Sequence, residues 1–63
     1  MNKQVAKAVA AKNAMYLYYV RDWNLWCIYH LVNQRSEYIS PSQLRKISQK
    51  DFHNLMNVVR GDV

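Results

Sequence analysis

Residues 15–32 read MYLYYVRDWNLWCIYHLV, and the architecture of the chain depends on whether this segment is helical or extended. On one continuous helix its polar residues should gather on one side, but at about 100° per residue they scatter around the axis. Its two apolar runs are rich in aromatic and β-branched residues, which favours strands. We therefore predict a β-hairpin over about 15–20 and 25–32, with an all-α chain that has a long N-terminal helix as the alternative.

The predicted turn, residues 21–24, suits a type I turn closed by Asn24 at positive φ, because Asn adopts that conformation best after Gly. A three-residue loop over 22–24 then pairs Val20 with Trp26 and Tyr18 with Ile28. A slip of one residue would exchange the faces of one strand. In this register one face carries Tyr16, Tyr18, Val20, Trp26, Ile28 and His30. The other face has the composition of a core and carries Met15, Leu17, Tyr19, Cys27, Tyr29 and Leu31.

A helix is predicted before the hairpin, over residues 2–13. The segment is rich in Ala, the best helix former, and contains neither Gly nor Pro. Asn2 can cap its start, and Asn13 can end it in a left-handed conformation.

Two short helices are predicted after a polar link over residues 33–40. Ser40-Pro41-Ser42-Gln43 has the pattern of a capping box with Pro at the first helical position. Ser48 and Asp51 would fall inside the apolar face of one long helix, whereas they suit the start of a second helix. We therefore predict helices over 41–47 and 49–60, the latter buried through Phe52, Leu55, Met56 and Val59 and ended by Gly61, and an α+β fold class.

The length of 63 residues allows a single small domain, residues 1–63, of marginal stability. The lone Cys27 excludes an intramolecular disulfide. The most apolar stretch is interrupted by Arg21 and Asp22, which argues against a membrane span. We expect a protein of the cytoplasm that makes no use of a membrane.

Catalytic and metal-binding motifs are not found in the chain. Cys27 and His30 are three residues apart and would point to opposite faces of a strand, so they could not act as nucleophile and base. A zinc site would require Cys27, His30, Asp51 and His53 to converge without the usual spacing. We predict a protein without enzymatic activity, cofactor or metal.

The net charge of +5, from nine Lys and Arg against four Asp and Glu, favours an anionic partner. Lys, Arg and Asn side chains can contact phosphates and base edges. The ordinary alternative is that these residues are the solvated faces of amphipathic helices. For a function in binding DNA or RNA, the candidate residues are Lys3, Lys7, Arg45, Lys46, Lys50, His53, Asn57 and Arg60.

The aromatic residues of the hairpin cannot all be buried in so small a domain, and exposed Tyr and Trp are good interface anchors. They could stack bases, form a homodimer or hold a larger host protein. The candidate partner-binding residues are Tyr16, Tyr18, Trp23, Trp26 and His30. We predict a small, basic, dimeric nucleic-acid-binding regulator. The alternative is an inhibitor or adaptor of phage or plasmid type that docks through its aromatic hairpin.

Overall fold

The computed structural model describes residues 1–62, so Val63, the last residue of the predicted domain, lies outside the described part. The elements follow one another as α1 (Lys3–Lys12), β1 (Met15–Val20), β2 (Leu25–His30), β3 (Ser36–Ile39), α2 (Pro41–Lys46) and α3 (Gln49–Arg60). The strands form one antiparallel sheet in the order β1-β2-β3. The predicted α+β fold is confirmed. The all-α alternative is wrong, because residues 15–30 pair as strands.

The hairpin turn is one residue longer than predicted. Arg21–Trp23 form a single 3₁₀ turn, and Asn24 follows with φ 51°, so the predicted positive φ of Asn24 is confirmed. Val20 pairs with Leu25 across a four-residue loop, and Tyr19 pairs with Trp26. The predicted pairing of Val20 with Trp26 is therefore wrong by one position.

This change of register moves every side chain of β2 to the other face, because strand side chains alternate. Ile28 and Trp26 join Leu17 and Met15 on the face that the helices cover. This register puts large aliphatic groups of both strands into one core. In the predicted register the core would have held Leu31, which is exposed and lies beyond the end of β2.

The segment predicted as a polar link contains the third strand, which the sequence analysis missed. Ser36–Ile39 pairs with β2, so that Ile39 lies beside Trp26 and Tyr38 beside Cys27. Ile39 is buried towards the helices, whereas Tyr38 projects from the opposite face. The strand follows a loop in which Gln34 has φ 63°. The backbone amide of Gln34 donates a hydrogen bond to the carbonyl oxygen of His30.

The end of α1 also differs from the prediction. Asn2 caps the start as expected, since its side-chain oxygen accepts a hydrogen bond from the Gln4 amide at 2.7 Å. Asn13 has φ −107°, however, and it is Ala14 that adopts the left-handed conformation, with φ 57°. The side chain of Asn13 instead donates to the carbonyl oxygen of Val9 at 2.8 Å, which satisfies a carbonyl near the helix end.

Both predicted starts of the C-terminal helices are confirmed. Ser40 and Gln43 form a reciprocal capping box at α2, and the hydroxyl of Ser48 accepts from the Asp51 amide at 3.1 Å at α3. Gly61 ends α3 with φ 83°. These caps fix the break between α2 and α3, so the two helices can take different directions over the sheet.

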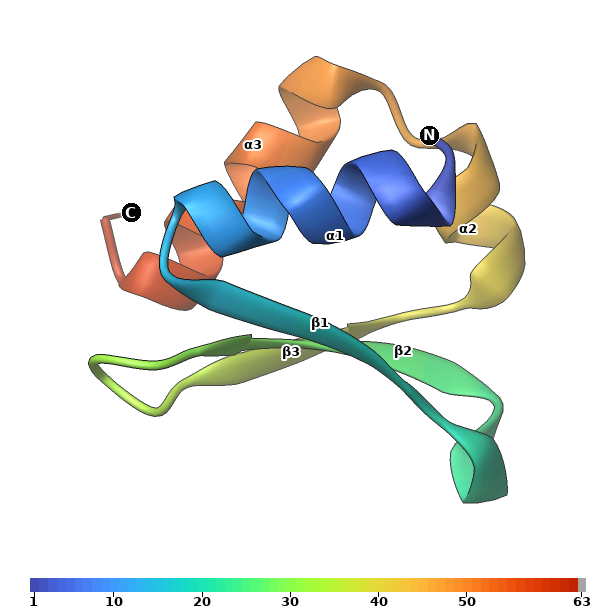
Figure 1. Cartoon of the computed structure of the whole chain (residues 1–63), viewed down its shortest axis with the longest axis horizontal. Helices are drawn as coiled ribbons and strands as arrows, with labels where there is room; N and C mark the ends of the chain where they lie inside the picture. The colour runs from blue at the N-terminus through green and yellow to red at the C-terminus, as the bar shows by residue number, and fades with distance from the viewer. Residues whose placement is uncertain (63) are drawn as a thin grey trace.

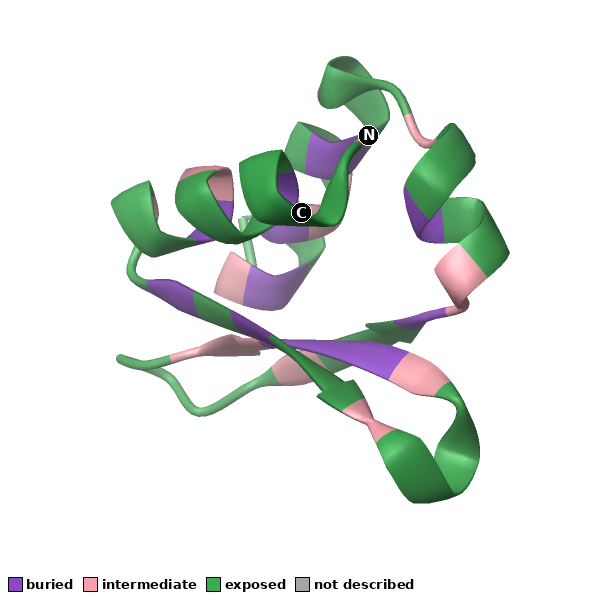
Figure 2. Cartoon of the chain, turned by 45° about the vertical axis from the view of Figure 1, so that its right-hand side comes forward, coloured by how far each residue is buried: buried purple, intermediate pink, exposed green. Residues whose placement is uncertain are grey.

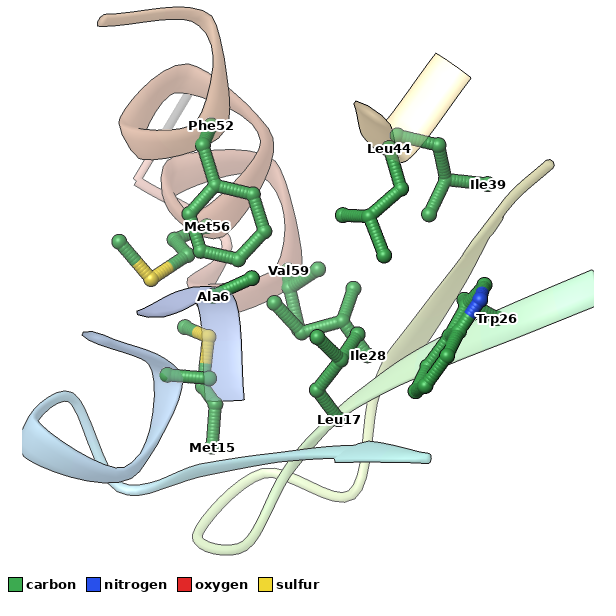
Figure 3. Close-up of a cluster of buried hydrophobic side chains, with 11 residues drawn as sticks. Ala6, Met15, Leu17, Trp26, Ile28, Ile39, Leu44, Phe52, Met56 and Val59 are labelled. Carbon is green, nitrogen blue, oxygen red and sulfur yellow. The ribbon is translucent and has the colours of Figure 1, made fainter. Parts of the chain in front are cut away.

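All three helices lie over one face of the sheet, and the other face is left uncovered (Figure 1). Buried and exposed residues alternate over the first four residues of β1, as expected for a sheet covered on one side only (Figure 2). Between the helices and the sheet lies the core, which Figure 3 shows in close-up. It comprises Ala6, Ala10, Met15, Leu17, Trp26, Ile28, Ile39, Leu44, Phe52, Met56 and Val59.

Candidate functional site

A groove opens at the end of the sheet that carries the hairpin turn. It lies between the N-terminal half of α1, the turn and α2, and its volume is about 720 Å³. Among residues 1–62, no Asp or Glu lines it. Its walls are formed by Met1, Asn2, Lys3, Gln4, Tyr19, Asn24, Trp26, Pro41, Leu44 and Arg45.

Cations reach the groove from two segments that are distant in the sequence. Lys3 comes from the first turn of α1 and Arg45 from the last turn of α2. Lys7, one turn after Lys3, places its Nζ 5.4 Å from the ring centroid of Trp26, within the range of a cation–π interaction. Three positive side chains are therefore gathered at one end of the molecule.

The segments that carry Lys3 and Arg45 are also joined through the backbone. The amino group of Met1 donates hydrogen bonds to the carbonyl oxygens of Leu44, Arg45 and Ile47, at 3.1, 2.7 and 3.2 Å. These carbonyls lie at the C-terminal end of α2, where a positive charge is favourable. The contact holds the start of the chain beside α2, as Figure 1 shows.

One wall of the groove is aromatic. The rings of Tyr19 and Trp26, which face each other across β1 and β2, lie 5.5 Å apart. Trp26 is buried, but Tyr19 is 42% exposed, since it lies beyond the area that α1 covers. The Tyr19 hydroxyl donates a hydrogen bond to the side-chain oxygen of Asn24. The left-handed turn residue thus fixes the orientation of an exposed aromatic ring.

The residues predicted to bind nucleic acid do not form one surface. Lys3 and Arg45 line the groove and Lys7 lies over the Trp26 ring in its wall. Lys46 instead lines a smaller hollow of about 410 Å³, together with Tyr38 and Leu55. Lys50 and His53 are exposed on α3 and line neither hollow.

Asn57 and Arg60 belong to an internal network at the end of α3. The Arg60 guanidinium donates to the side chains of Asn13 and Asp62, each at 3.1 Å, and to that of Asn57. The side-chain amide of Asn33 donates to the last carbonyls of the same helix. These contacts tie α1, the β2–β3 loop and α3 together, and they engage the guanidinium that was predicted to bind phosphate.

On the uncovered face of the sheet, which we call the tyrosine face, all outward strand residues are uncharged. This face consists of outward residues of the three strands together with the Trp23 ring from the turn. Tyr16 and Trp23 are about 60% exposed, and Tyr38 is 47% exposed. The three strands contain neither Lys nor Arg. Its members are Tyr16, Tyr18, Val20, Trp23, Leu25, Cys27, Tyr29, Ser36 and Tyr38.

Aromatic contacts organise this face. The ring centroids of Tyr16 and Tyr18 lie 5.5 Å apart, and those of Trp23 and Tyr38 lie 5.6 Å apart in an edge-on arrangement. Cys27 is buried between its cross-strand partners Tyr18 and Tyr38. A hydrogen bond with the Cys27 side chain raises the pKa of Tyr18 to about 12.

Of the residues predicted to bind a protein partner, Tyr16, Tyr18 and Trp23 lie on the tyrosine face. Trp26 and His30 lie on the opposite side of the sheet, so the predicted grouping of all five is wrong. The cause is the one-residue difference in register described above. Tyr29 and Tyr38 were not among the predicted residues, although Tyr38 beside Ile39 has the alternation of a strand.

Cys27 and His30 do lie on opposite faces of β2, as their spacing predicts. Within residues 1–62, no cluster of three or more His, Cys, Asp or Glu could hold a metal ion. None of the helices in that same range is both long enough and apolar enough to cross a membrane.

Comparisons of the chain with family models, with curated proteins and with solved structures found no match. The functional argument therefore rests on the groove and the tyrosine face.

Proposed function

We propose that the protein is a small, non-enzymatic nucleic-acid-binding regulator that holds a single-stranded segment of DNA or RNA in the groove between α1, α2 and the hairpin turn. The observation that carries this proposal is that Lys3 and Arg45 line one groove with the exposed ring of Tyr19, while Lys7 lies over the ring of Trp26 in its wall. The same proposal places the action of the protein in the cytoplasm, where RNA and, in cells without a nucleus, DNA are accessible.

The two chemical features of the groove match the two parts of a nucleotide. Lys and Arg side chains neutralise phosphates, and an exposed aromatic ring can stack a base with about 1–3 kcal/mol per base. Asn2 and Gln4, which also line the groove, offer amide groups that can bond to base edges. The absence of Asp and Glu from its lining, within the described residues, leaves the anion without a like charge to repel it.

The dimensions of the groove support a single strand over a duplex. Its volume of about 720 Å³ falls within the range of about 300–1,000 Å³ typical of small-ligand sites. One or two unstacked nucleotides fit such a space, whereas a duplex presents its bases only through its grooves. The Tyr19 ring can stack a base only if that base is unpaired.

The test is a fluorescence-anisotropy titration of labelled, mixed-sequence single-stranded 8-mers of DNA and RNA, in 50 and 200 mM NaCl. Three phosphate contacts to a single strand predict a slope of about −2 for log K against log salt, which is roughly a 20-fold loss of affinity over that range. Absence of binding in 50 mM NaCl, or affinity that does not change with salt, would contradict the proposal.

Variants locate the binding. We expect Lys3→Gln/Arg45→Gln to lower affinity at least about tenfold, because two of three phosphate contacts are lost. The matched control is Lys12→Gln/Lys50→Gln, which removes the same charge from helix positions outside the groove. Equal losses in both variants would mean that net charge, and no particular site, attracts the nucleic acid.

A second candidate function, an inhibitor or adaptor that docks a larger host protein, is favoured by the tyrosine face. Exposed Tyr and Trp side chains without neighbouring charge are typical of protein interfaces. Separation of that face from the groove allows the two functions to be tested with different variants.

A further inference from the structure

The tyrosine face is a contiguous aromatic surface on a chain that is otherwise basic. Tyr16, Tyr38 and Trp23 are each about half exposed or more, and the strand residues that share this face are uncharged. Monomeric proteins rarely leave large apolar patches uncovered, and such patches mark interaction sites. The question is which partner fits this one.

We propose that the tyrosine face binds a second copy of the same chain, sheet against sheet, in a two-fold symmetric dimer. The inference goes beyond the proposed function, because the face and the groove lie on opposite sides of the sheet and share no residue. Each copy would keep its helices, and with them its groove, on the outside.

The charge distribution favours a second copy as the occupant. Two chains of net charge +5 repel each other unless neutral surfaces meet. The strands hold none of the nine Lys and Arg, so the sheets can meet without opposing like charges. Stacked sheets lie about 10 Å apart, and the helix layers lie further out. The cations on the helices of the two copies are then separated by more than the Debye length of about 8 Å.

A two-fold contact needs a surface that complements itself. The tyrosine face offers rings and hydroxyls in the same arrangement from both sides, so that a ring edge of one copy can meet a ring face of the other. Each Tyr hydroxyl can donate and accept a hydrogen bond, which allows it to pair with another Tyr. A contact built in this way needs no second type of surface.

The size of the face sets the expected strength of the dimer. Its five aromatic side chains present on average a little under half of their 150–250 Å², which gives roughly 500 Å² per copy. Two copies bury roughly 1,000 Å², the lower end of the range for specific interfaces. We therefore expect a dissociation constant in the micromolar range, roughly 1–100 μM.

The first test is sedimentation velocity of the intact chain between 1 and 500 μM. The proposal predicts a reversible shift from monomer to dimer across this range. A chain that remains monomeric at 500 μM, or that forms species larger than a dimer, overturns it. The monomeric result would assign the tyrosine face to a different protein.

Variants identify the surface. Tyr16→Ser/Tyr38→Ser removes two exposed rings and is expected to weaken the dimer at least tenfold, while circular dichroism keeps the spectrum of the fold. Leu31→Ser/Val32→Ser is the matched control, since it removes two exposed apolar groups from the β2–β3 loop outside the face. A dimer lost in the loop variant and kept in the tyrosine variant overturns the proposal.

A measurement on the unaltered chain covers the case in which the tyrosine variant does not fold. Amide chemical shifts followed on dilution should move along β1, β2 and β3 at the outward positions, and stay constant at Lys3 and Arg45. Addition of the single-stranded 8-mer should shift the groove residues and leave the dimer signals in place. Displacement of the dimer by the oligonucleotide would mean that bases stack on the tyrosine face, which overturns the proposal.

Discussion

The two faces of the sheet differ although they are built from alternate residues of the same strands. Along β1, Met15 and Leu17 are 3% exposed beneath the helices, while Tyr16 and Tyr18 between them stay in contact with solvent. Over residues 15–18, the side chains on the covered face are non-aromatic. Tyrosines, whose hydroxyls tolerate water, occupy the other. A surface that contacts water in the free protein and is buried in a complex needs amphipathic side chains such as Tyr.

The same division separates charge from aromatic surface. Lys3, Lys7 and Arg45 belong to the helix layer, and the tyrosine face on the other side carries no cation. At the margin of the helix layer, the exposed ring of Tyr19 lines the same groove as Lys3 and Arg45.

The largest contrast between the faces is expected in stability. Ile28 is fully buried at the centre of β2, so Ile28→Ala removes core volume and should lower the free energy of unfolding by about 2–5 kcal/mol. A domain of this size has only marginal stability, so the variant should be largely unfolded at 37 °C.

The matched change on the tyrosine face is Tyr16→Ala, for which we expect a loss of about 1 kcal/mol or less, because the ring is 60% exposed. Urea unfolding followed by circular dichroism measures both. Equal losses in the two variants would show that the tyrosine face is part of the core of each single chain.

The caps of the helix layer should have an intermediate effect. Ser48→Ala removes the acceptor of the Asp51 amide and is expected to lower the free energy of unfolding by about 1 kcal/mol. Asn54→Ala, at an exposed position of the same helix, serves as the control and should be close to neutral. If Ser48→Ala leaves the thermal midpoint unchanged, the break between α2 and α3 does not depend on this cap.

A stabilising substitution is expected where α1 meets the sheet. Ala14 has φ 57°, a conformation that costs a residue with a Cβ about 1–2 kcal/mol and costs Gly nothing. Part of that gain is lost because Gly is more flexible in the unfolded chain. Ala14→Gly should therefore raise the free energy of unfolding by about 0.5–1 kcal/mol in thermal or urea unfolding. A destabilised variant would contradict the left-handed turn.

The smallest effect is electrostatic and lies on the tyrosine face. The side chain of Cys27 raises the pKa of Tyr18 to about 12, from about 10 in an unfolded chain. Between these pH values the unfolded chain releases the proton and the folded chain keeps it. The contribution of Tyr18 to the free energy of unfolding is therefore fully present below pH 10, and it is lost as pH rises through about 12.

Ultraviolet titration of tyrosinate absorbance measures this pKa, and Tyr18→Phe identifies the step that belongs to Tyr18. In Cys27→Ala the Tyr18 step should move towards 10, because the hydrogen bond is removed. An unchanged midpoint in that variant would show that Cys27 is not the cause of the shift.

Local signals predicted the fold well where a single residue type determines the geometry. The capping box at Ser40, the cap at Ser48 and the left-handed conformations of Asn24 and Gly61 follow from the residue types at these positions. The register of the hairpin does not follow in this way. Loops of three or four residues both suit the turn sequence, and the choice is made by packing against helices distant in the sequence.

The same reasoning explains the remainder of what the sequence analysis missed. Ser36–Ile39 becomes a strand because β2 offers a free edge, and only Tyr38 and Ile39 in that polar segment indicate it. The groove depends on Lys3 and Arg45, which are brought together by tertiary contacts alone. Cations could be recognised as candidates from the sequence, whereas their grouping could not.

The central claim is that the groove and the tyrosine face are separate sites. It is tested most directly by the affinity of one labelled single-stranded 8-mer for two variants, each at nanomolar concentration so that dimerisation does not contribute. The account predicts that Lys3→Gln/Arg45→Gln binds at least about tenfold more weakly than the unaltered chain. Tyr16→Ser/Tyr38→Ser should stay within about twofold of it. The reverse pattern, with affinity lost in the tyrosine variant and kept in the groove variant, would contradict the account.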